Sequence, residues 1–126
     1  MANQRTILIV EDDGFLVQMY AAKLEMEGFK VVAAVDGEKA LRQVKKEVPD
    51  LILLDLLLPK KDGFQVLEEL KKDSAVKNVP VVVLSNLGQK EDIDRCLSLG
   101  AKDYLIKAHF VPSEVVEKIK TLLESY

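Results

Sequence analysis

The sequence predicts an α/β fold in which five parallel strands alternate with five helices. Two observations support this prediction. Short apolar runs recur along the 126 residues, and the stretches between them carry apolar residues at helical spacing. Strands joined by helices run parallel, and right-handed crossovers place the helices on both faces of the sheet. Because the sequence has neither internal repeats nor a linker, we expect one domain over residues 1–126.

The strands are expected where the short apolar runs occur. The first run, Ile7–Val10, is apolar at every position, which is typical of a strand buried on both faces. The other four strands are expected over residues 30–35, 51–55, 80–85 and 103–107.

The helices are expected between these strands, with ends marked by particular residues. Asp13 and Asp36 suit the N-caps of the first two helices, and Gly28 suits the end of the first. The third helix is expected to begin at Gly63, and Pro112 suits the first turn of the fifth helix. The spacing predicts that the buried faces carry Phe15, Leu16, Met19, Tyr20 and Leu24; Ala40, Leu41 and Val44; Phe64, Leu67 and Leu70; Ile93, Cys96 and Leu97; and Val115, Val116, Ile119, Leu122 and Leu123.

The composition, with 48% apolar and 31% charged residues, is typical of a globular protein. No apolar run approaches the roughly 18 residues of a membrane span, and the N-terminal run is too short for a signal peptide. We therefore expect a cytoplasmic protein without membrane association. The net charge of −3 gives no case for nucleic-acid binding, and the lysine pairs at 45–46, 60–61 and 71–72 are expected to be solvated. The single cysteine, Cys96, is expected to pack in the core.

Acidic residues follow two of the predicted strands. Glu11 and Asp12 come after the first strand, and Asp55 ends the third. If these strands are adjacent, the carboxylates meet at one sheet edge, where parallel sheets bind ligands. Two unit charges about 4 Å apart at an effective dielectric of about 20 repel by about 4 kcal/mol, so the cluster needs a cation, a proton or separation. A divalent cation with oxygen ligands is the expected partner.

Two further polar residues, Ser85 and Lys107, end the fourth and fifth strands. Together with the carboxylates they suit the chemistry of an acyl phosphate. A carboxylate can attack phosphorus, a divalent cation and Lys107 can neutralise the transferring oxygens, and Ser85 can donate a hydrogen bond to one of them.

Four motifs occur in order between residues 5 and 124. They are Ile7-Leu8-Ile9-Val10-Glu11-Asp12-Asp13; Asp55-Leu56-Leu57-Leu58-Pro59 with Asp62-Gly63; Leu84-Ser85; and Leu99-Gly100-Ala101 followed by Tyr104-Leu105-Ile106-Lys107. With these motifs the chain resembles a response-regulator receiver domain of two-component signalling, of the single-domain chemotaxis-regulator type. The resemblance implies a flavodoxin-like (βα)5 three-layer sandwich with strand order 2-1-3-4-5.

The resemblance also implies roles at the strand ends. Asp55 would accept a phosphoryl group from a phosphohistidine on a histidine kinase or a histidine phosphotransfer protein. Mg²⁺ would be held by Asp12 directly, by Glu11 through water, by Asp55 and by the backbone carbonyl of Leu57. Lys107 would pair with the phosphoryl group.

Ser85 would be the switch hydroxyl, and Tyr104 would be the aromatic residue that follows it. Phosphorylation would then change the face formed by the fourth helix, fifth strand and fifth helix, which would bind a downstream protein or a second copy. A protein of this kind is not an enzyme for free substrates, since it catalyses only its own phosphorylation and slow dephosphorylation.

Two positions depart from the family pattern. Ala108 stands where the family usually has proline after the lysine, and a cis bond before a non-proline residue costs about 2.5–4 kcal/mol. We therefore predict a trans Lys107–Ala108 bond. Asn86 follows Ser85, where a very small residue is usual, and its amide could narrow access to Asp55 or donate to the phosphoryl oxygens.

Three other functions are considered. A Mg²⁺-dependent aspartyl-phosphate phosphohydrolase of the haloacid-dehalogenase type should carry Asp-x-Asp, which Glu11-Asp12-Asp13 breaks. An FMN carrier needs a phosphate-binding loop after the first strand, and this acidic loop would repel phosphate. A phosphorylation-independent interaction module on the same fold is disfavoured by the intact Asp12, Asp55 and Lys107.

Overall fold

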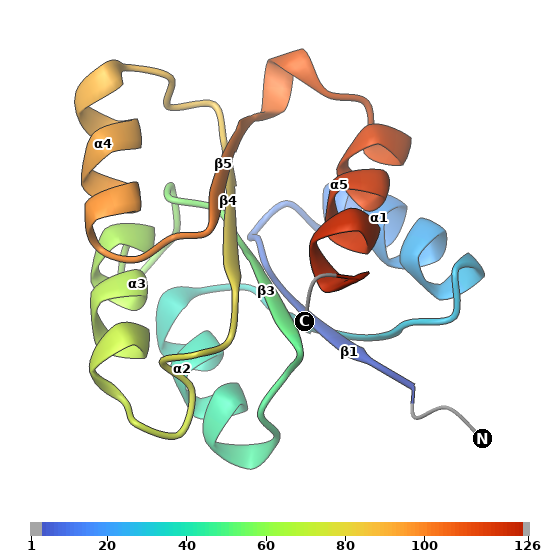
Figure 1. The fold of residues 1–126 in the computed structure, drawn as a ribbon, viewed down its shortest axis with the longest axis horizontal. Helices are drawn as coiled ribbons and strands as arrows, with labels where there is room; N and C mark the ends of the chain where they lie inside the picture. Colours follow the sequence, from blue (N-terminus) through green and yellow to red (C-terminus); the bar gives the residue numbers. More distant parts are fainter. Residues whose placement is uncertain (1–3, 125–126) are drawn as a thin grey trace.

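A five-stranded parallel sheet lies at the centre of the protein, with helices on both faces (Figure 1). The computed structural model describes residues 4–124. The strands are β1 (Thr6–Val10), β2 (Lys30–Ala34), β3 (Leu51–Leu54), β4 (Val81–Ser85) and β5 (Asp103–Ile106). Their spatial order is β2-β1-β3-β4-β5, which confirms the predicted 2-1-3-4-5. The order of the chain reverses at β1, which lies between β2 and β3.

The helices follow the strands as predicted. They are α1 (Gly14–Met26), α2 (Gly37–Lys46), α3 (Gly63–Lys72), α4 (Lys90–Ser98) and α5 (Pro112–Glu124). Asp13 and Asp36 accept backbone hydrogen bonds as the N-caps of α1 and α2, and α5 begins at Pro112. A positive φ of 94° at Gly28 ends the first helix. No described helix could cross a membrane, because none is both long and apolar enough.

Two hydrophobic cores occupy the two faces of the sheet. In Figure 1, α2, α3 and α4 lie on one side of the sheet, and α1 and α5 lie on the other. Alternate residues of β1 serve different cores, since Leu8 packs with α2, α3 and α4 while Ile7 and Ile9 pack with α1 and α5. This arrangement explains why the first strand is apolar at every position.

Two predicted core residues lie at the surface. The side chain of Phe15 is 70% exposed and that of Leu97 is 46% exposed. The buried stripe of α1 contains Tyr20 and Leu24, and Phe15 lies off that stripe; in α4, Cys96 is buried and the adjacent Leu97 points away. Helical spacing found both helices but placed their buried stripes too broadly.

Two lysines also differ from the sequence prediction. Lys107 is not the last residue of β5, because it begins a short 3-10 helix, η1 (Lys107–His109). Lys71 is not fully solvated. Its stem lies against Gly100, and its Nζ donates to the backbone carbonyls of Lys77 and Val79 at 3.0 and 3.2 Å.

Every peptide bond among the described residues is trans, including that between Lys107 and Ala108, as predicted.

Candidate functional site

The acidic residues meet at the carboxyl end of the sheet because β1 and β3 are direct neighbours. Val10 pairs with Leu54, and the backbone N–H of Asp55 donates to the carbonyl of Val10 at 3.0 Å. One carboxylate oxygen from each of Glu11, Asp12 and Asp55 lies within 4.8 Å of the others. The predicted adjacency, and with it the predicted cluster, is confirmed.

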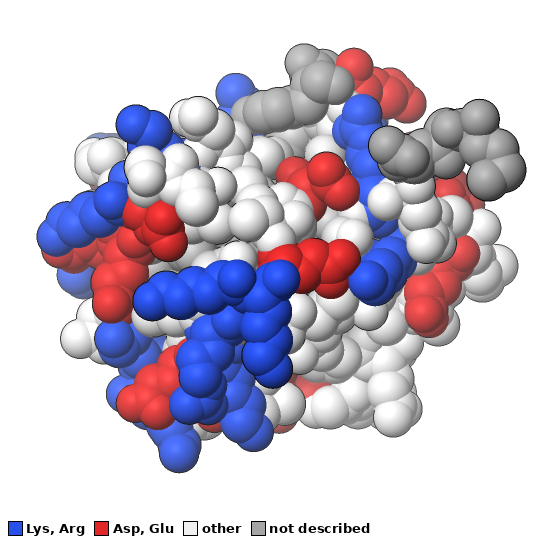
Figure 2. All heavy atoms as spheres, turned by 90° about the horizontal axis from the view of Figure 1, so that it is seen from below, with Lys and Arg blue, Asp and Glu red and all other residues white. Residues whose placement is uncertain are grey.

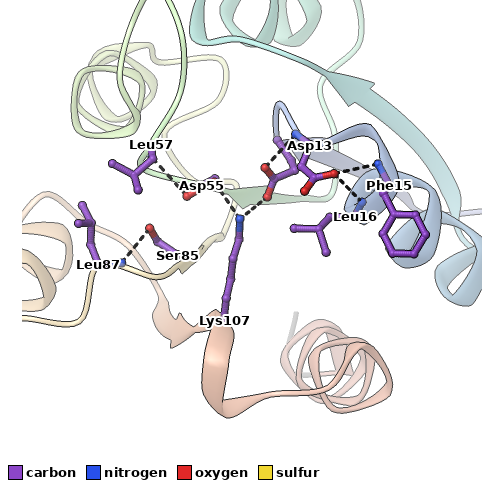
Figure 3. A network of polar contacts seen from close by, with 9 residues as sticks. Asp13, Phe15, Leu16, Asp55, Leu57, Ser85, Leu87 and Lys107 are labelled. Atoms are coloured by element: carbon purple, nitrogen blue, oxygen red, sulfur yellow. Dashed lines mark hydrogen bonds and ion pairs between the residues drawn. The ribbon is translucent and has the colours of Figure 1, made fainter.

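Two of these acids are buried and share one cation. Glu11 is 4% exposed and Asp55 is 6% exposed. The Nζ of Lys107 donates to Oε1 of Glu11 at 2.5 Å and to Oδ2 of Asp55 at 2.9 Å (Figure 3). The pairing of Lys107 with Glu11 was not predicted, since sequence reasoning assigned this lysine to the phosphoryl group alone.

Burial and pairing act in opposite directions on these groups. Burial raises the pKa of Glu11, and the hydrogen bond from Lys107 only partly offsets this effect. Burial disfavours the charged form of Lys107, but its hydrogen bonds to Glu11 and Asp55 outweigh burial and raise the pKa of the ammonium. Lys107 is therefore a permanent cation at neutral pH.

The charges of the site fit a divalent cation. With Lys107 protonated and the three acids ionised, the four residues carry a net charge of −2. Glu11 and Asp55 are buried, whereas Asp12 is exposed at the edge of the cluster and open to solvent. Carboxylate oxygens are the ligands that Mg²⁺ prefers. The position of the Leu57 carbonyl relative to such an ion stays a prediction.

The loop after β3 holds Asp55 through short-range contacts. Oδ1 of Asp55 accepts a hydrogen bond from the backbone N–H of Leu57 at 3.2 Å, and the N–H of Gly63 donates to the carbonyl of Leu56 at 2.9 Å. Asp62 forms a capping box with Gln65 at the start of α3. Asp62 therefore acts in helix capping, a role that was not predicted from the sequence.

Ser85 and Tyr104 contact the same residue of the loop after β4. Ser85 is fully buried, and its Oγ accepts a hydrogen bond from the N–H of Leu87 at 3.3 Å. The hydroxyl of Tyr104 donates to the carbonyl of Leu87. Burial raises the pKa of Tyr104 to about 12, so this hydroxyl stays a donor at neutral pH. The sequence offered no signal for Leu87 as the link between the two predicted switch residues.

Other residues near the site are exposed. Leu57, two positions after Asp55, is 55% exposed, and Asn86 is also exposed beside the buried Ser85. A groove of about 640 Å³ lies beside β5 and α5 and contains none of the predicted site residues. The cavity that touches Glu11 and Asp55 measures only about 10 Å³.

Comparison with known proteins places this geometry in context. Residues 7–120 match the family model of the response regulator receiver domain. Over 119 residues the chain is 42% identical to the phosphate regulon transcriptional regulatory protein PhoB of Escherichia coli, which covers 94% of this chain and 52% of that protein. The chain thus spans about half the length of the curated relatives it matches.

Solved structures agree with the sequence match. A CheY-like response regulator receiver domain protein from Methanospirillum hungatei superposes with a TM-score of 0.90 at 28% identity, covering 98% of this chain and 96% of that chain. The Mn²⁺-bound form of response regulator Rcp1 superposes with a TM-score of 0.86 at 30% identity, covering 97% and 96%. The matched segment contains every predicted site residue, and the strand order and acidic edge are those that the motifs implied. The chain therefore belongs to the response regulator receiver domain family of two-component signalling.

Proposed function

We propose that Asp55 is the phosphoacceptor of this receiver domain. The observation that carries the proposal is the position of its carboxylate. It directly follows the central strand β3, is 6% exposed, and lies 2.9 Å from the ammonium of Lys107 and within a cluster of three acids. Asp12 is exposed, and Glu11 and Asp55 both pair with Lys107; of these two, Asp55 follows the central strand β3 and is the residue that the family motif implies as the acceptor.

The proposed step transfers a phosphoryl group from a phosphohistidine. A carboxylate oxygen of Asp55 attacks phosphorus, a P–O bond forms as the P–N bond breaks, and the electron pair of that bond stays on the imidazole. Lys107 pairs with the transferred oxygens. The donor is a histidine kinase or a histidine phosphotransfer protein.

Glu11, Asp12 and Asp55 would hold Mg²⁺, with Leu57 contributing its backbone carbonyl. The net charge of −2 at these residues and Lys107 supports this assignment, as does the Mn²⁺-bound form of the similar regulator Rcp1. When bound, the ion neutralises negative charge on the transferring oxygens. The 2.5 Å ion pair between Lys107 and Glu11 holds the lysine beside the acidic cluster.

The proposed output is a change of the face formed by α4, β5 and α5. Ser85 and Tyr104 both contact Leu87, which lies in the loop that leads into α4. Movement of the Ser85 hydroxyl toward a phosphoryl group would break its bond to Leu87 and release one restraint on this loop. A downstream protein or a second copy of the chain would bind the altered face.

We also infer that the chain does not turn over free substrates. The cavity at Glu11 and Asp55 measures about 10 Å³, whereas pockets for small molecules usually measure about 300–1,000 Å³. The groove of about 640 Å³ is lined by neither Glu11 nor Asp55. A steady-state phosphatase assay should therefore show at most one slow turnover per Asp55.

Intact-mass measurement after incubation with acetyl phosphate tests the proposal. With Mg²⁺, we expect the chain to gain the mass of one phosphoryl group, and we expect no gain after removal of divalent ions. Asp55→Asn should abolish the gain, whereas Asp62→Asn, which keeps an acceptor oxygen at the cap of α3, should retain it. Equal phosphorylation of the Asp55→Asn variant would disprove the assignment.

A further inference from the structure

The exposed side of α2 carries four cations without anionic partners. Lys39, Arg42, Lys45 and Lys46 are exposed, and none of them forms an ion pair with any residue in the described range 4–124. At 3.6 residues per turn they lie opposite the buried Ala40 and Val44. We call these four residues the α2 basic stripe. Figure 2 shows a group of Lys and Arg side chains gathered over this part of the molecule.

Three of the other helices each contain a lysine that pairs with an acid of the same helix. Lys72 pairs with Glu68 in α3, and Lys90 pairs with Asp94 in α4. In α5, Lys120 lies 3.6 Å from Glu117. The α2 basic stripe lacks such pairs, although Arg42 and Lys46 are four residues apart, a spacing at which like charges destabilise a helix.

The helix dipole explains only part of the stripe. Lys45 and Lys46 occupy the last turn, where cations are favourable. Lys39 lies in the first turn, where the dipole disfavours a cation, and Arg42 lies in the middle. Helix stability therefore does not account for a stripe that extends along the whole of α2.

We propose that the α2 basic stripe binds an acidic helix of a partner protein. From Lys39 to Lys46 the stripe is about 10 Å long, which matches two turns of a helix with acidic residues three and four positions apart. This length is close to the Debye length of about 8 Å at physiological ionic strength, so the four charges act together. Val35 and Val48, which flank α2 in the chain, are 44% and 48% exposed and offer apolar contacts to a protein.

The charge of the remaining chain favours a protein over nucleic acid. Outside the stripe, the sequence contains 14 Lys and Arg residues and 21 Asp and Glu residues, so the rest of the chain carries a net charge of −7. A DNA duplex presents one phosphate charge per roughly 1.7 Å along its length, and it would bring many phosphates near these acids. A short acidic helix would contact the stripe alone.

The stripe is separate from the acidic site. α2 follows the carboxyl end of β2 and leads away from the site edge, so its occupant would leave Asp55 accessible. The inference therefore does not rest on the proposed phosphorylation, and a variant of the stripe should gain phosphoryl mass from acetyl phosphate like the unmodified chain.

Fluorescence anisotropy tests the proposal at physiological ionic strength. The probe is a labelled helical peptide with Glu at positions spaced by three and four, compared with its Gln counterpart, a 20-base-pair DNA duplex and vesicles containing phosphatidylserine. We expect binding of the Glu peptide alone. The fourfold variant Lys39→Gln, Arg42→Gln, Lys45→Gln and Lys46→Gln should bind it at least about tenfold more weakly.

A matched control removes the same charge elsewhere. The variant Lys23→Gln, Lys72→Gln, Lys77→Gln and Lys90→Gln also loses four exposed cations and should change binding less than about twofold. Equal weakening by the two fourfold variants, no binding of the Glu peptide, or tighter binding of the duplex or vesicles would overturn the proposal. Circular dichroism of both variants checks that they are folded.

Discussion

Substitution of Gly63 tests how tightly the loop that carries Asp55 is packed. Gly63 begins α3, and a Cβ added to it would lie 2.5 Å from the carbonyl oxygen of Asp55 and 2.5 Å from Cα of Leu56. Both neighbours are backbone atoms of the segment that positions the proposed acceptor. Ordinary van der Waals contact starts at about 3.4 Å, so Gly63→Ala must move one chain segment by about 1 Å.

The expected loss of stability follows from this geometry. Overpacking of this kind costs about 1–3 kcal/mol, and disturbance of the 2.9 Å hydrogen bond from Gly63 to Leu56 costs about 1 kcal/mol more. The restricted unfolded state of an alanine variant recovers about 0.5 kcal/mol. We expect Gly63→Ala to lower the free energy of unfolding by about 1.5–3.5 kcal/mol and to slow phosphorylation of Asp55.

Gly14→Ala provides a matched control. Gly14 is also the first residue of a helix after an aspartate N-cap, but an added Cβ meets no heavy atom within 4 Å. This variant should be neutral or more stable by up to about 1 kcal/mol. Urea unfolding at 25 °C measures both effects. The slope of the unfolding free energy against urea concentration should be the same in both variants and in the unmodified chain. If the two variants differ by less than about 0.5 kcal/mol, the steric argument is wrong.

Three further outcomes are expected. Tyr104→Phe should lower the free energy of unfolding by about 1 kcal/mol, because the carbonyl of Leu87 loses its donor; an unchanged urea midpoint would contradict this. Leu57→Asn should admit water beside phosphorylated Asp55; a barrier lower by about 1 kcal/mol corresponds to roughly fivefold faster loss of phosphoryl mass, and an unchanged rate would exclude this role for the leucine. Burial raises the pKa of Cys96 to about 11, so the thiol of the unfolded chain loses its proton at lower pH than the thiol of the folded chain. The free energy of unfolding should therefore fall between about pH 9 and 11, by up to about 3 kcal/mol from this group. In Cys96→Ala, the urea midpoint should decline less between pH 8 and pH 10 than in the unmodified chain.

The order of elements was predictable from local sequence, whereas their arrangement in the sheet was not. Apolar runs and caps such as Asp13 and Asp36 depend on neighbouring residues, so each element could be placed within a few positions. Adjacency of β1 and β3 depends on pairing between residues more than 40 positions apart, and periodicity does not encode it. The resemblance to a known family supplied that information and thereby brought Glu11 and Asp55 together.

Contacts between side chains from different elements were the least predictable part of the site. Lys107 and Glu11 are 96 positions apart, and their ion pair depends on where η1 turns after β5. The stack of Arg95 over the ring of Phe64, 4.1 Å from its centroid, likewise depends on how α4 lies against α3. Residue types alone identify such groups as possible partners but do not choose among them.

The ion pairs of Lys107 connect metal binding to phosphoryl transfer. In the structure its single ammonium pairs with two buried carboxylates, so removing Lys107 would leave Glu11 and Asp55 buried without a compensating charge. A divalent cation held by Glu11, Asp12 and Asp55 would supply this compensation from the solvent side. With the ion bound, we expect Lys107 to be able to pair with the phosphoryl oxygens on Asp55. Lys107 would thus compensate the buried carboxylates before phosphorylation, and the ion would compensate them afterwards.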